Sequence, residues 1–357
     1  MHLRRFFLIF IPVLLVLSGG GAFCYWQQQN SEKSSTNNLL LSDSIAGEKT
    51  DDLLFFPPPL REIGEPPAFH ESLLTGLART SGDPEKILGV MIDEAPAARP
   101  LHRGIEYARI VFEAPAEGGI PRLLALFSSD DFPEKVGPVR SARHYFVQMA
   151  EPIAGAYAHA GGSPLGLEEV YQSSLLNIDE GFNDTRFERD TTIARPHNLF
   201  LLPKMVEEDI PPSSQEKAIF FFSDEIPQNE EAAPVLEIDF STEQHSVSWQ
   251  YNSEKGCYQR KQQLETSDVC VENVIVIVTS IWHIEGDEKG RLDMTNTGKG
   301  IATVFRDGKA FPGTWSRKAG EIFHLFNESQ EEIPLKPGKS FFEIIGSEEQ
   351  FSFSSPG

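Results

Sequence analysis

The apolar positions between residues 87 and 160 form short continuous runs and one stretch with helical spacing. Continuous or alternating apolar runs predict strands, and these lie at residues 87–93, 108–113, 123–128 and 154–160. Before the last of these, Ala142, Tyr145, Phe146 and Met149 recur at the spacing of one helix face. We expect this helix to begin at Val139 and to end at residue 151, because the proline that follows disfavours helical backbone in the residue before it.

The pattern changes after a Pro/Ser-rich segment at residues 210–214. Short β-branched and aromatic runs follow, and turn signals such as Asp307-Gly308 separate them, which is typical of strands joined by tight turns. We therefore predict an α/β or α+β domain over residues 68–212 and an all-β barrel or sandwich over residues 213–357.

The N-terminus carries a different signal. Residues 6–26 are apolar and uncharged and follow two arginines, and about 20 such residues are enough to span a bilayer. Residues 1–26 are predicted to form a single-pass transmembrane helix with its N-terminus in the cytoplasm, and residues 27–67 a disordered linker to extracytoplasmic domains. A cleaved signal segment, or a lipid anchor at Cys24, is an alternative. We favour the uncleaved helix, and lipidation is disfavoured because Phe23 stands where a small residue is expected.

The net charge of −22 indicates a protein that does not bind nucleic acid. Against this acidity, Arg140 and Arg143 are conspicuous at the start of the predicted helix, where the helix dipole already contributes positive charge. An anion is expected to offset them. It is either a ligand or the protein's own carboxylates.

A second anion-binding feature follows the strand at 154–160. Gly161 and Gly162 precede Ser163, a predicted helix N-cap, and proline at the first helical position. Free backbone N–H groups at such a corner bind anions, although many ordinary strand–helix connections look the same. Together with the arginines, this gives a predicted ligand-binding cleft of Arg122, Arg140, Ser141, Arg143, Gly161, Gly162, Ser163, Arg195, His197 and Asn198.

An enzymatic interpretation uses other residues. Glu113 and Glu117, with His159, could form the carboxylate pair and base of an acid–base site, or the two glutamates could simply neutralise Arg140 and Arg143. Whether the protein is an enzyme stays open, and no cofactor or metal site is predicted. Cys257 and Cys270 flank a polar turn, so they are either a disulfide or two free thiols.

Several longer motifs carry a family resemblance. GPVRSARHYFV, EAPAEGGIPR, HAGGSP, RPHNL, ENVIVIV and GTW resemble the YerB-like bacterial lipoproteins over about residues 87–345. The resemblance implies a cell-envelope protein with a two-part domain of unknown function, an N-terminal α/β part and a C-terminal β part. It implies no activity and no catalytic residue.

The sequence as a whole favours a membrane-tethered envelope protein that binds an anionic cell-wall ligand, either a peptidoglycan fragment or a teichoic-acid-like polymer. The alternatives are a cell-wall glycan hydrolase or transferase and a protein-interaction adaptor that uses its β domain. The pattern does not predict the oligomeric state.

Overall fold

The computed structural model describes residues 71–79, 81–182, 184–213, 215, 217–226, 231–262 and 265–354, all of which belong to one compact unit. The predicted anchor and linker at residues 1–67 lie outside the described residues. Within the described part of the chain, every helix is too short or too polar to cross a bilayer.

The described chain up to residue 213, called here the N-terminal segment, contributes seven strands and two α-helices. Their bounds are β1 (Ile87–Asp93), β2 (Ile110–Pro115), β3 (Pro121–Ser128), α1 (His144–Ala150), β4 (Ala156–His159), α2 (Pro164–Gln172), β5 (Leu176–Asp179), β6 (Phe187–Arg189) and β7 (Leu199–Leu201).

The C-terminal segment, from residue 231 onwards, contributes strands. Their bounds are β8 (Glu231–Ala232), β9 (Val235–Asp239), β10 (Ser246–Asn252), β11 (Cys257–Gln262), β12 (Glu265–Val271), β13 (Asn273–Val278), β14 (Ile281–His283), β15 (Leu292–Met294), β16 (Gly298–Arg306), β17 (Lys309–Arg317), β18 (His324–Phe326), β19 (Ser340–Ile345) and β20 (Phe351–Ser354).

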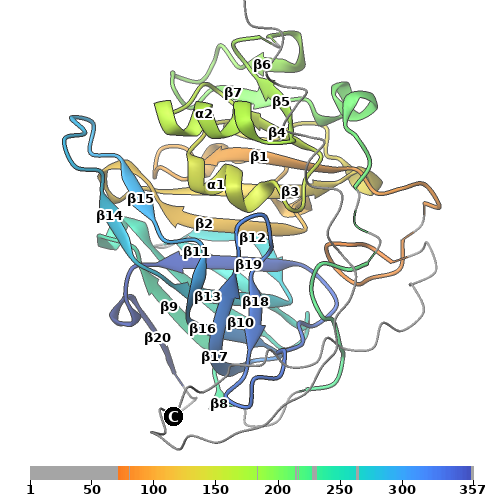
Figure 1. The fold of residues 1–357 in the computed structure, drawn as a ribbon, viewed down its shortest axis with the longest axis vertical. Helices are drawn as coiled ribbons and strands as arrows, with labels where there is room; N and C mark the ends of the chain where they lie inside the picture. The colour runs from red at the N-terminus through yellow and green to blue at the C-terminus, as the bar shows by residue number, and fades with distance from the viewer. Residues whose placement is uncertain are drawn as a thin grey trace, which may run out of the picture. The chain divides into compact units, whose positions relative to one another are not determined.

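One sheet of eleven strands runs through both segments, in the order β18-β17-β16-β13-β19-β2-β3-β1-β4-β5, with β8 paired to β17. The segments meet where β2 pairs with β19 in parallel. In Figure 1, β2 (yellow-orange) accordingly lies beside β19 (blue). A second, antiparallel sheet has the order β12-β11-β10-β9-β20.

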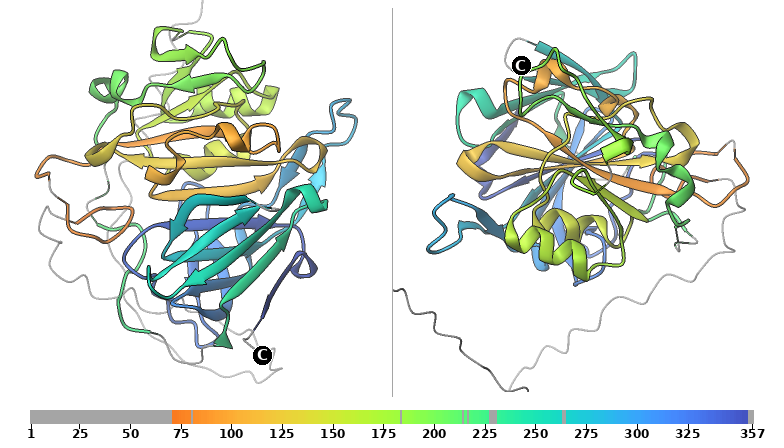
Figure 2. Two further views of the ribbon diagram at one scale, coloured as in Figure 1. Left: turned by 180° about the vertical axis from the view of Figure 1, so that it is seen from behind. Right: turned by 90° about the horizontal axis from the view of Figure 1, so that it is seen from above.

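Two cores lie on opposite faces of the large sheet. On one face, residues such as Val111 and Phe341 pack with Trp249 and Tyr258 of the five-stranded sheet. On the other face, alternate residues such as Phe112 pack against helix α1. The helices and the five-stranded sheet therefore cover different faces, as the two views of Figure 2 show. Alternation along a strand decides which side chain points to which core.

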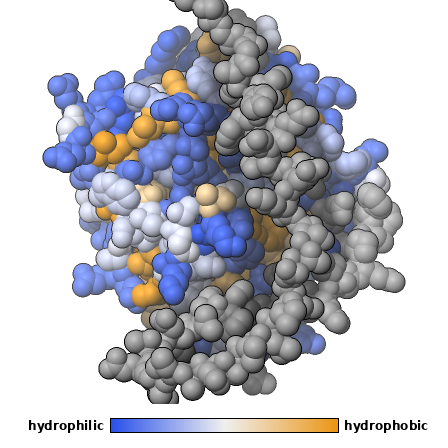
Figure 3. Space-filling model, viewed as in Figure 1, coloured by the Kyte–Doolittle hydropathy of each residue, from blue (hydrophilic) through white to orange (hydrophobic). Residues whose placement is uncertain are grey.

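The C-terminal strands do not form a barrel of their own, because β19 continues the sheet into the N-terminal segment. Of the two predicted architectures for this part, only the packed-sheet one agrees with the described strands. The fold is β-rich with few helices, in a two-part arrangement. On the face drawn in Figure 3, hydrophilic residues surround smaller hydrophobic groups, as expected for a strongly charged chain.

The predicted start of the first helix is wrong. Helix α1 begins at His144, and its N-cap, Arg143, has an extended backbone. The end of the helix agrees with the prediction. Residues before it are extended because Val139 bridges to Ile92 and Ala142 to Gly162. Long-range backbone pairing therefore overrides the local helical spacing, and Arg140 lies outside the helix.

Candidate functional site

A polar cavity of about 210 Å³ opens between the N-terminal segment and the β14–β15 hairpin. Four of the ligand-binding residues predicted from the sequence line it, and Lys289 and Arg291 come from the hairpin loop. The complete lining is Glu117, Ser141, Arg143, Gly162, Ser163, Lys289 and Arg291.

The most strongly bonded pair in the cavity is Arg143 with Glu117. Arg143 Nε donates to Glu117 Oε1 and Nη2 donates to Oε2, both at 2.6 Å. Arg143 Nη1 donates to the Ala142 carbonyl at 2.6 Å, which fixes the plane of the guanidinium. Partial burial alone would raise the pKa of Glu117, but the hydrogen bonds and charge of Arg143 outweigh it, and the pKa lies below its ordinary value. Glu117 is therefore an anion at neutral pH.

Arg122 lies behind this pair. Its Nη1 donates to the Ser141 carbonyl at 3.0 Å, and its Nη2 is 3.6 Å from Glu117 Oε2. Burial, followed by the nearby charge of Arg143, lowers the pKa of Arg122 to about 10, so it still carries its charge at neutral pH. Two guanidinium groups thus share one carboxylate, which leaves an excess of positive charge on this wall of the cavity.

The hairpin contributes two further cations to the lining, Lys289 and Arg291. Arg291 Nη1 pairs with Asp287 at 2.6 Å, while the exposed Lys289 ammonium has no hydrogen bond or ion pair among the described residues. The hairpin is attached to the N-terminal segment through His144 Nε2, 2.8 Å from Asp293 Oδ1. This contact holds strand β15 of the hairpin beside α1.

The floor of the cavity is the predicted corner before α2. Ser163 is the N-cap, its hydroxyl accepts a hydrogen bond from Gly166 N at 3.0 Å, and proline follows at the first helical position. This confirms the predicted helix start. The backbone N–H of Gly161, however, already donates to the Asp179 carboxylate at 3.0 Å. Only part of the corner is therefore available to an anion.

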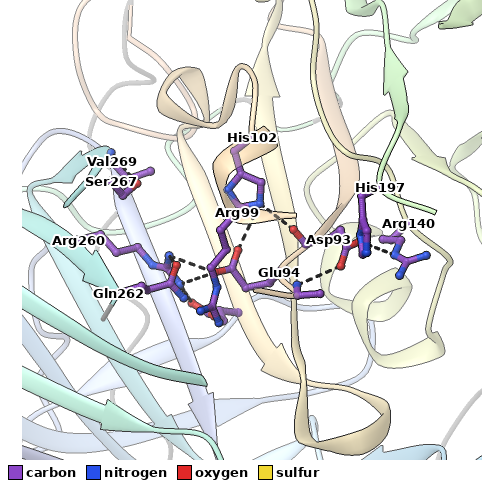
Figure 4. A network of polar contacts seen from close by, with 12 residues as sticks. Asp93, Glu94, Arg99, His102, Arg140, His197, Arg260, Gln262, Ser267 and Val269 are labelled. Carbon is purple, nitrogen blue, oxygen red and sulfur yellow. Dashed lines mark hydrogen bonds and ion pairs between the residues drawn. The ribbon is translucent and has the colours of Figure 1, made fainter. Parts of the chain in front are cut away.

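Arg140 and His197 form a different group, around Asp93. Asp93 Oδ2 lies 2.8 Å from Arg140 Nε and 2.6 Å from His197 Nδ1. Figure 4 shows the three side chains together. Neither cation lines the cavity of Arg143. Arg140 and Arg143 therefore contact separate carboxylates.

The last two predicted ligand-binding residues lie in the loop before β7. Arg195 is exposed. Asn198 is buried, and it accepts a hydrogen bond from Arg189 and donates one to the Asp190 carbonyl. Its amide stabilises the loop in which it lies, and neither residue lines the cavity. Their ligand-binding role stays a prediction.

The predicted catalytic residues do not share one contact network. Glu113 is fully buried and accepts a hydrogen bond from Arg260 Nη2 at 2.7 Å, away from Glu117. His159 is also fully buried, with its ring nitrogens 2.8 Å from the Gly161 carbonyl and 2.9 Å from Asn177 Oδ1. Their catalytic role stays a prediction, and the carboxylate that lines the cavity is Glu117.

The partner of Glu113 was missed in the sequence. Arg260 of β11 is almost fully buried and also contacts Glu94, which in turn contacts Arg99 at 3.1 Å. Figure 4 shows this chain of contacts from Arg260 to Arg99. Burial raises the pKa of Glu113 to about 7. The positive charge of Arg260 acts to lower this pKa, and the negative charge of Glu94 acts to raise it.

Lys289 and Arg291 were missed as well. They stand in the polar stretch EGDEKGR, which the sequence shows only as a charged turn. The spacing of residues gives no sign that this turn meets Arg143. Of the two alternatives left open for Cys257 and Cys270, the structure has the disulfide. Among the described residues, no three His, Cys, Asp or Glu side chains are grouped as a metal site requires.

The comparisons with known proteins agree with this two-part structure. Residues 74–216 match the family described as "Protein of unknown function (DUF3048) N-terminal domain", and residues 236–342 match its C-terminal domain. The chain is 30% identical over 290 residues to "Putative lipoprotein YerB" of Bacillus subtilis, covering 76% of this chain and 85% of that protein. The chain belongs to the DUF3048 family.

The family membership confirms the resemblance inferred from the motifs. The crystal structure of the YerB protein from Bacillus subtilis superposes with a TM-score of 0.70 at 26% identity, over 80% of this chain and 99% of that one. In both family matches the description is of unknown function. These matches therefore assign no chemistry to the residues of the cavity.

Proposed function

We propose that this member of the DUF3048 family is an extracytoplasmic cell-envelope protein that binds an anionic cell-wall ligand in the cavity of Arg143, Lys289 and Arg291. The observation that carries the proposal is the concentration of cations in one place. Arg122, Arg143, Lys289 and Arg291 lie in or directly behind the cavity of a chain whose net charge is −22.

The local charge balance supports an anionic ligand. Four cationic groups face two carboxylates, Glu117 and Asp287, and the Lys289 ammonium has no partner among the described residues. Because guanidinium and ammonium groups together bind phosphate and carboxylate oxygens, a ligand bearing such groups would complete the site. The hydroxyl groups of Ser141 and Ser163 add polar contacts on the same surface.

The arrangement favours binding over glycan hydrolysis. A hydrolase needs two carboxyl groups that open onto one groove, one of them protonated as the general acid. Glu113 is fully buried, and Glu117 is held as an anion by Arg143. Because the Glu113 carboxyl is closed off from solvent and does not line the cavity, these two residues lack the shared groove that a catalytic pair requires.

Attachment to the membrane is the second part of the proposal. The relative from Bacillus subtilis carries the name "Putative lipoprotein YerB", and the apolar stretch at residues 6–26 of this chain is long enough to span a bilayer. We favour an uncleaved anchor. Intact-mass measurement of the membrane-extracted protein is expected to retain residue 1, whereas a chain that begins with a lipid-modified Cys24 would contradict it.

Ligand binding is tested with the full chain in detergent and purified wall polymer. Lys289→Ala removes an exposed cation from the cavity, and Lys318→Ala, in an exposed pair with Glu321, is a matched control for the loss of one charge. We expect sedimentation with the polymer to weaken severalfold for Lys289→Ala, most at low ionic strength. The control is expected to bind like the wild type. Equal binding by both variants would contradict the assignment of this cavity.

A further inference from the structure

The strongest anion-binding position in the cavity is already filled by the protein itself. Glu117 occupies the Nε–Nη2 edge of Arg143 with both carboxylate oxygens, at 2.6 Å each. That two-point geometry is the one in which arginine binds an external carboxylate or phosphate. Because Arg143 Nη1 is bonded to the Ala142 carbonyl, the edge held by Glu117 is the one that a ligand would need.

We propose that Glu117 is an internal competitor in the anion site, and that the ligand displaces it with a phosphate group. This inference rests on the proposed function and adds its regulation and its ligand chemistry. In the free protein the carboxylate of Glu117 neutralises Arg143. In the bound protein, phosphate oxygens take its place, and the Glu117 side chain turns towards solvent.

The segment that carries Glu117 has room for this movement. The Glu117 side chain is 22% exposed, and the two glycines after it have φ near +70°. Among the described residues other than its chain neighbours, no heavy atom lies within 4 Å of the position that a Cβ of Gly118 would take. Ser241 fixes the next residue by donating to the Gly119 carbonyl at 2.8 Å. Rotation of one side chain next to a fixed backbone is therefore enough to open the Arg143 edge.

The chemistry of the competitor indicates the chemistry of the ligand. A carboxylate ligand offers two oxygens and one negative charge, as Glu117 does, but Glu117 is held close by the chain and so competes at a high effective concentration. A phosphate monoester offers three terminal oxygens and up to two charges. It has oxygens for Arg143 and a further one for Lys289 or Arg291, which line the same cavity. A phosphate group therefore displaces Glu117 where a simple carboxylate does not.

The test compares Glu117→Gln with the wild type by calorimetric titration of the full chain in detergent. The probes are glycerol phosphate, a poly(glycerol phosphate) whose phosphates are diesters, and succinate. Glu188→Gln is the matched control, because it removes one carboxylate from an exposed pair with Lys135 outside the cavity. Arg143→Ala, alone and combined with Glu117→Gln, reports whether the gain depends on the freed guanidinium.

We expect Glu117→Gln to bind glycerol phosphate about tenfold more tightly than the wild type. The ligand then no longer has to displace a charged carboxylate from the Arg143 edge, so a larger fraction of the free protein can bind it. Succinate is expected to bind the Gln variant and not the wild type. Glu188→Gln should change the affinity for glycerol phosphate less than twofold. Adding Arg143→Ala to Glu117→Gln should abolish the tighter binding. Glycerol phosphate is expected to bind more tightly than the polymer, because only a monoester has three terminal oxygens and up to two charges. The reverse preference would contradict the assignment of a terminal phosphate to the ligand.

Two results would overturn the inference in distinguishable ways. If the wild type binds phosphate through Arg143 and Glu117→Gln binds no more tightly, Glu117 is not a competitor, although the proposed anion site stands. If neither the wild type nor Glu117→Gln binds any of the probes, the site itself is refuted. Should Glu117→Gln melt well below the wild type, Glu117→Asp replaces it, because the shorter side chain keeps the charge but loses its two-point contact. The same tighter binding is expected of it.

Discussion

Glu113 and Glu343 lie opposite each other on the parallel strands β2 and β19, and both are fully buried. This pair stands at the strand junction that joins the two family segments. Arg260 donates to Glu113, and Trp249 Nε1 donates to Glu343 Oε1, both at 2.7 Å. Burial, and then the charge of Glu113, raises the pKa of Glu343 well above its ordinary value. Two carboxyl groups so close in an apolar core are expected to retain a proton at neutral pH.

The first prediction concerns pH and Glu113. Burial raises its pKa from 4.5 to about 7, although the facing guanidinium of Arg260 opposes this and the charge of Glu94 reinforces it. The folded protein therefore holds a proton that the unfolded chain releases. The stabilisation from this proton is complete below about pH 4.5 and is lost as the pH rises through about 7.

Glu113→Gln has no such proton to lose. As the pH rises from 5 to 8, the free energy of unfolding of the wild type is therefore expected to fall relative to that of Glu113→Gln. Urea unfolding at several pH values measures the difference. The exposed Glu254→Gln is the control, and its difference from the wild type should stay constant over the same range. A constant difference for Glu113→Gln as well would show that the buried pair does not titrate there.

The second prediction concerns Arg260, whose guanidinium lies between Glu94 and Glu113. Arg260→Met leaves Glu113 buried without its cation and Glu94 with Arg99, and breaking a buried ion pair in this way costs about 3–5 kcal/mol. The free energy of unfolding should fall by that amount. The double variant with Glu113→Gln should lose less than the sum of the two single changes, because one stranded charge is gone. Additive losses would contradict the assigned contact.

The third prediction concerns the Cys257–Cys270 disulfide, which links β11 to β12 across a sequence separation of 13. Closing a loop of this size restricts the unfolded chain and is worth about 2–4 kcal/mol. Replacing both cysteines by serine should lower the free energy of unfolding by this amount while β10 and β11 stay paired. Adding a reductant should destabilise the wild type and leave the double serine variant unchanged.

The sequence predicted those features that depend on neighbouring residues. Ser163 caps α2 and proline follows it, because the signals for a helix start lie within four residues of each other. The run ILGVMID is buried throughout as β1, since a strand covered on both faces is apolar along its whole length. The end of α1 before Pro152 is equally local.

The features that were missed depend on long-range pairing. Arg143 is extended because Ala142 bridges to Gly162, and that contact leaves no trace in the helical spacing of the segment. Lys289 reaches the cavity only because the β14–β15 hairpin contacts α1 through Asp293. Glu343 lies inside an apolar strand, and its importance is visible only once β19 is placed beside β2.

The last prediction concerns Gly166, the third residue of α2. In most helices a change of glycine to alanine gains up to about 1 kcal/mol. Here a Cβ would lie 2.6 Å from the Ala142 carbonyl oxygen and 2.9 Å from Ser163 Oγ. The first of these is a backbone atom of the segment that carries Arg143, so it cannot simply rotate away. Overpacking of this kind costs about 1–3 kcal/mol, which exceeds the gain in helix propensity.

Gly166→Ala is therefore expected to lower the melting temperature by several degrees. Because the displaced backbone carries Ser141 and Arg143, it should also weaken binding of phosphate-bearing probes at the cavity. Gly82→Ala is the matched control, since a Cβ there would meet no heavy atom of the structurally described chain within 4 Å and its φ lies outside the left-handed region. That change should be neutral or slightly stabilising. A Gly166→Ala variant as stable as the control would mean that α2 can move away from Ala142 at little cost.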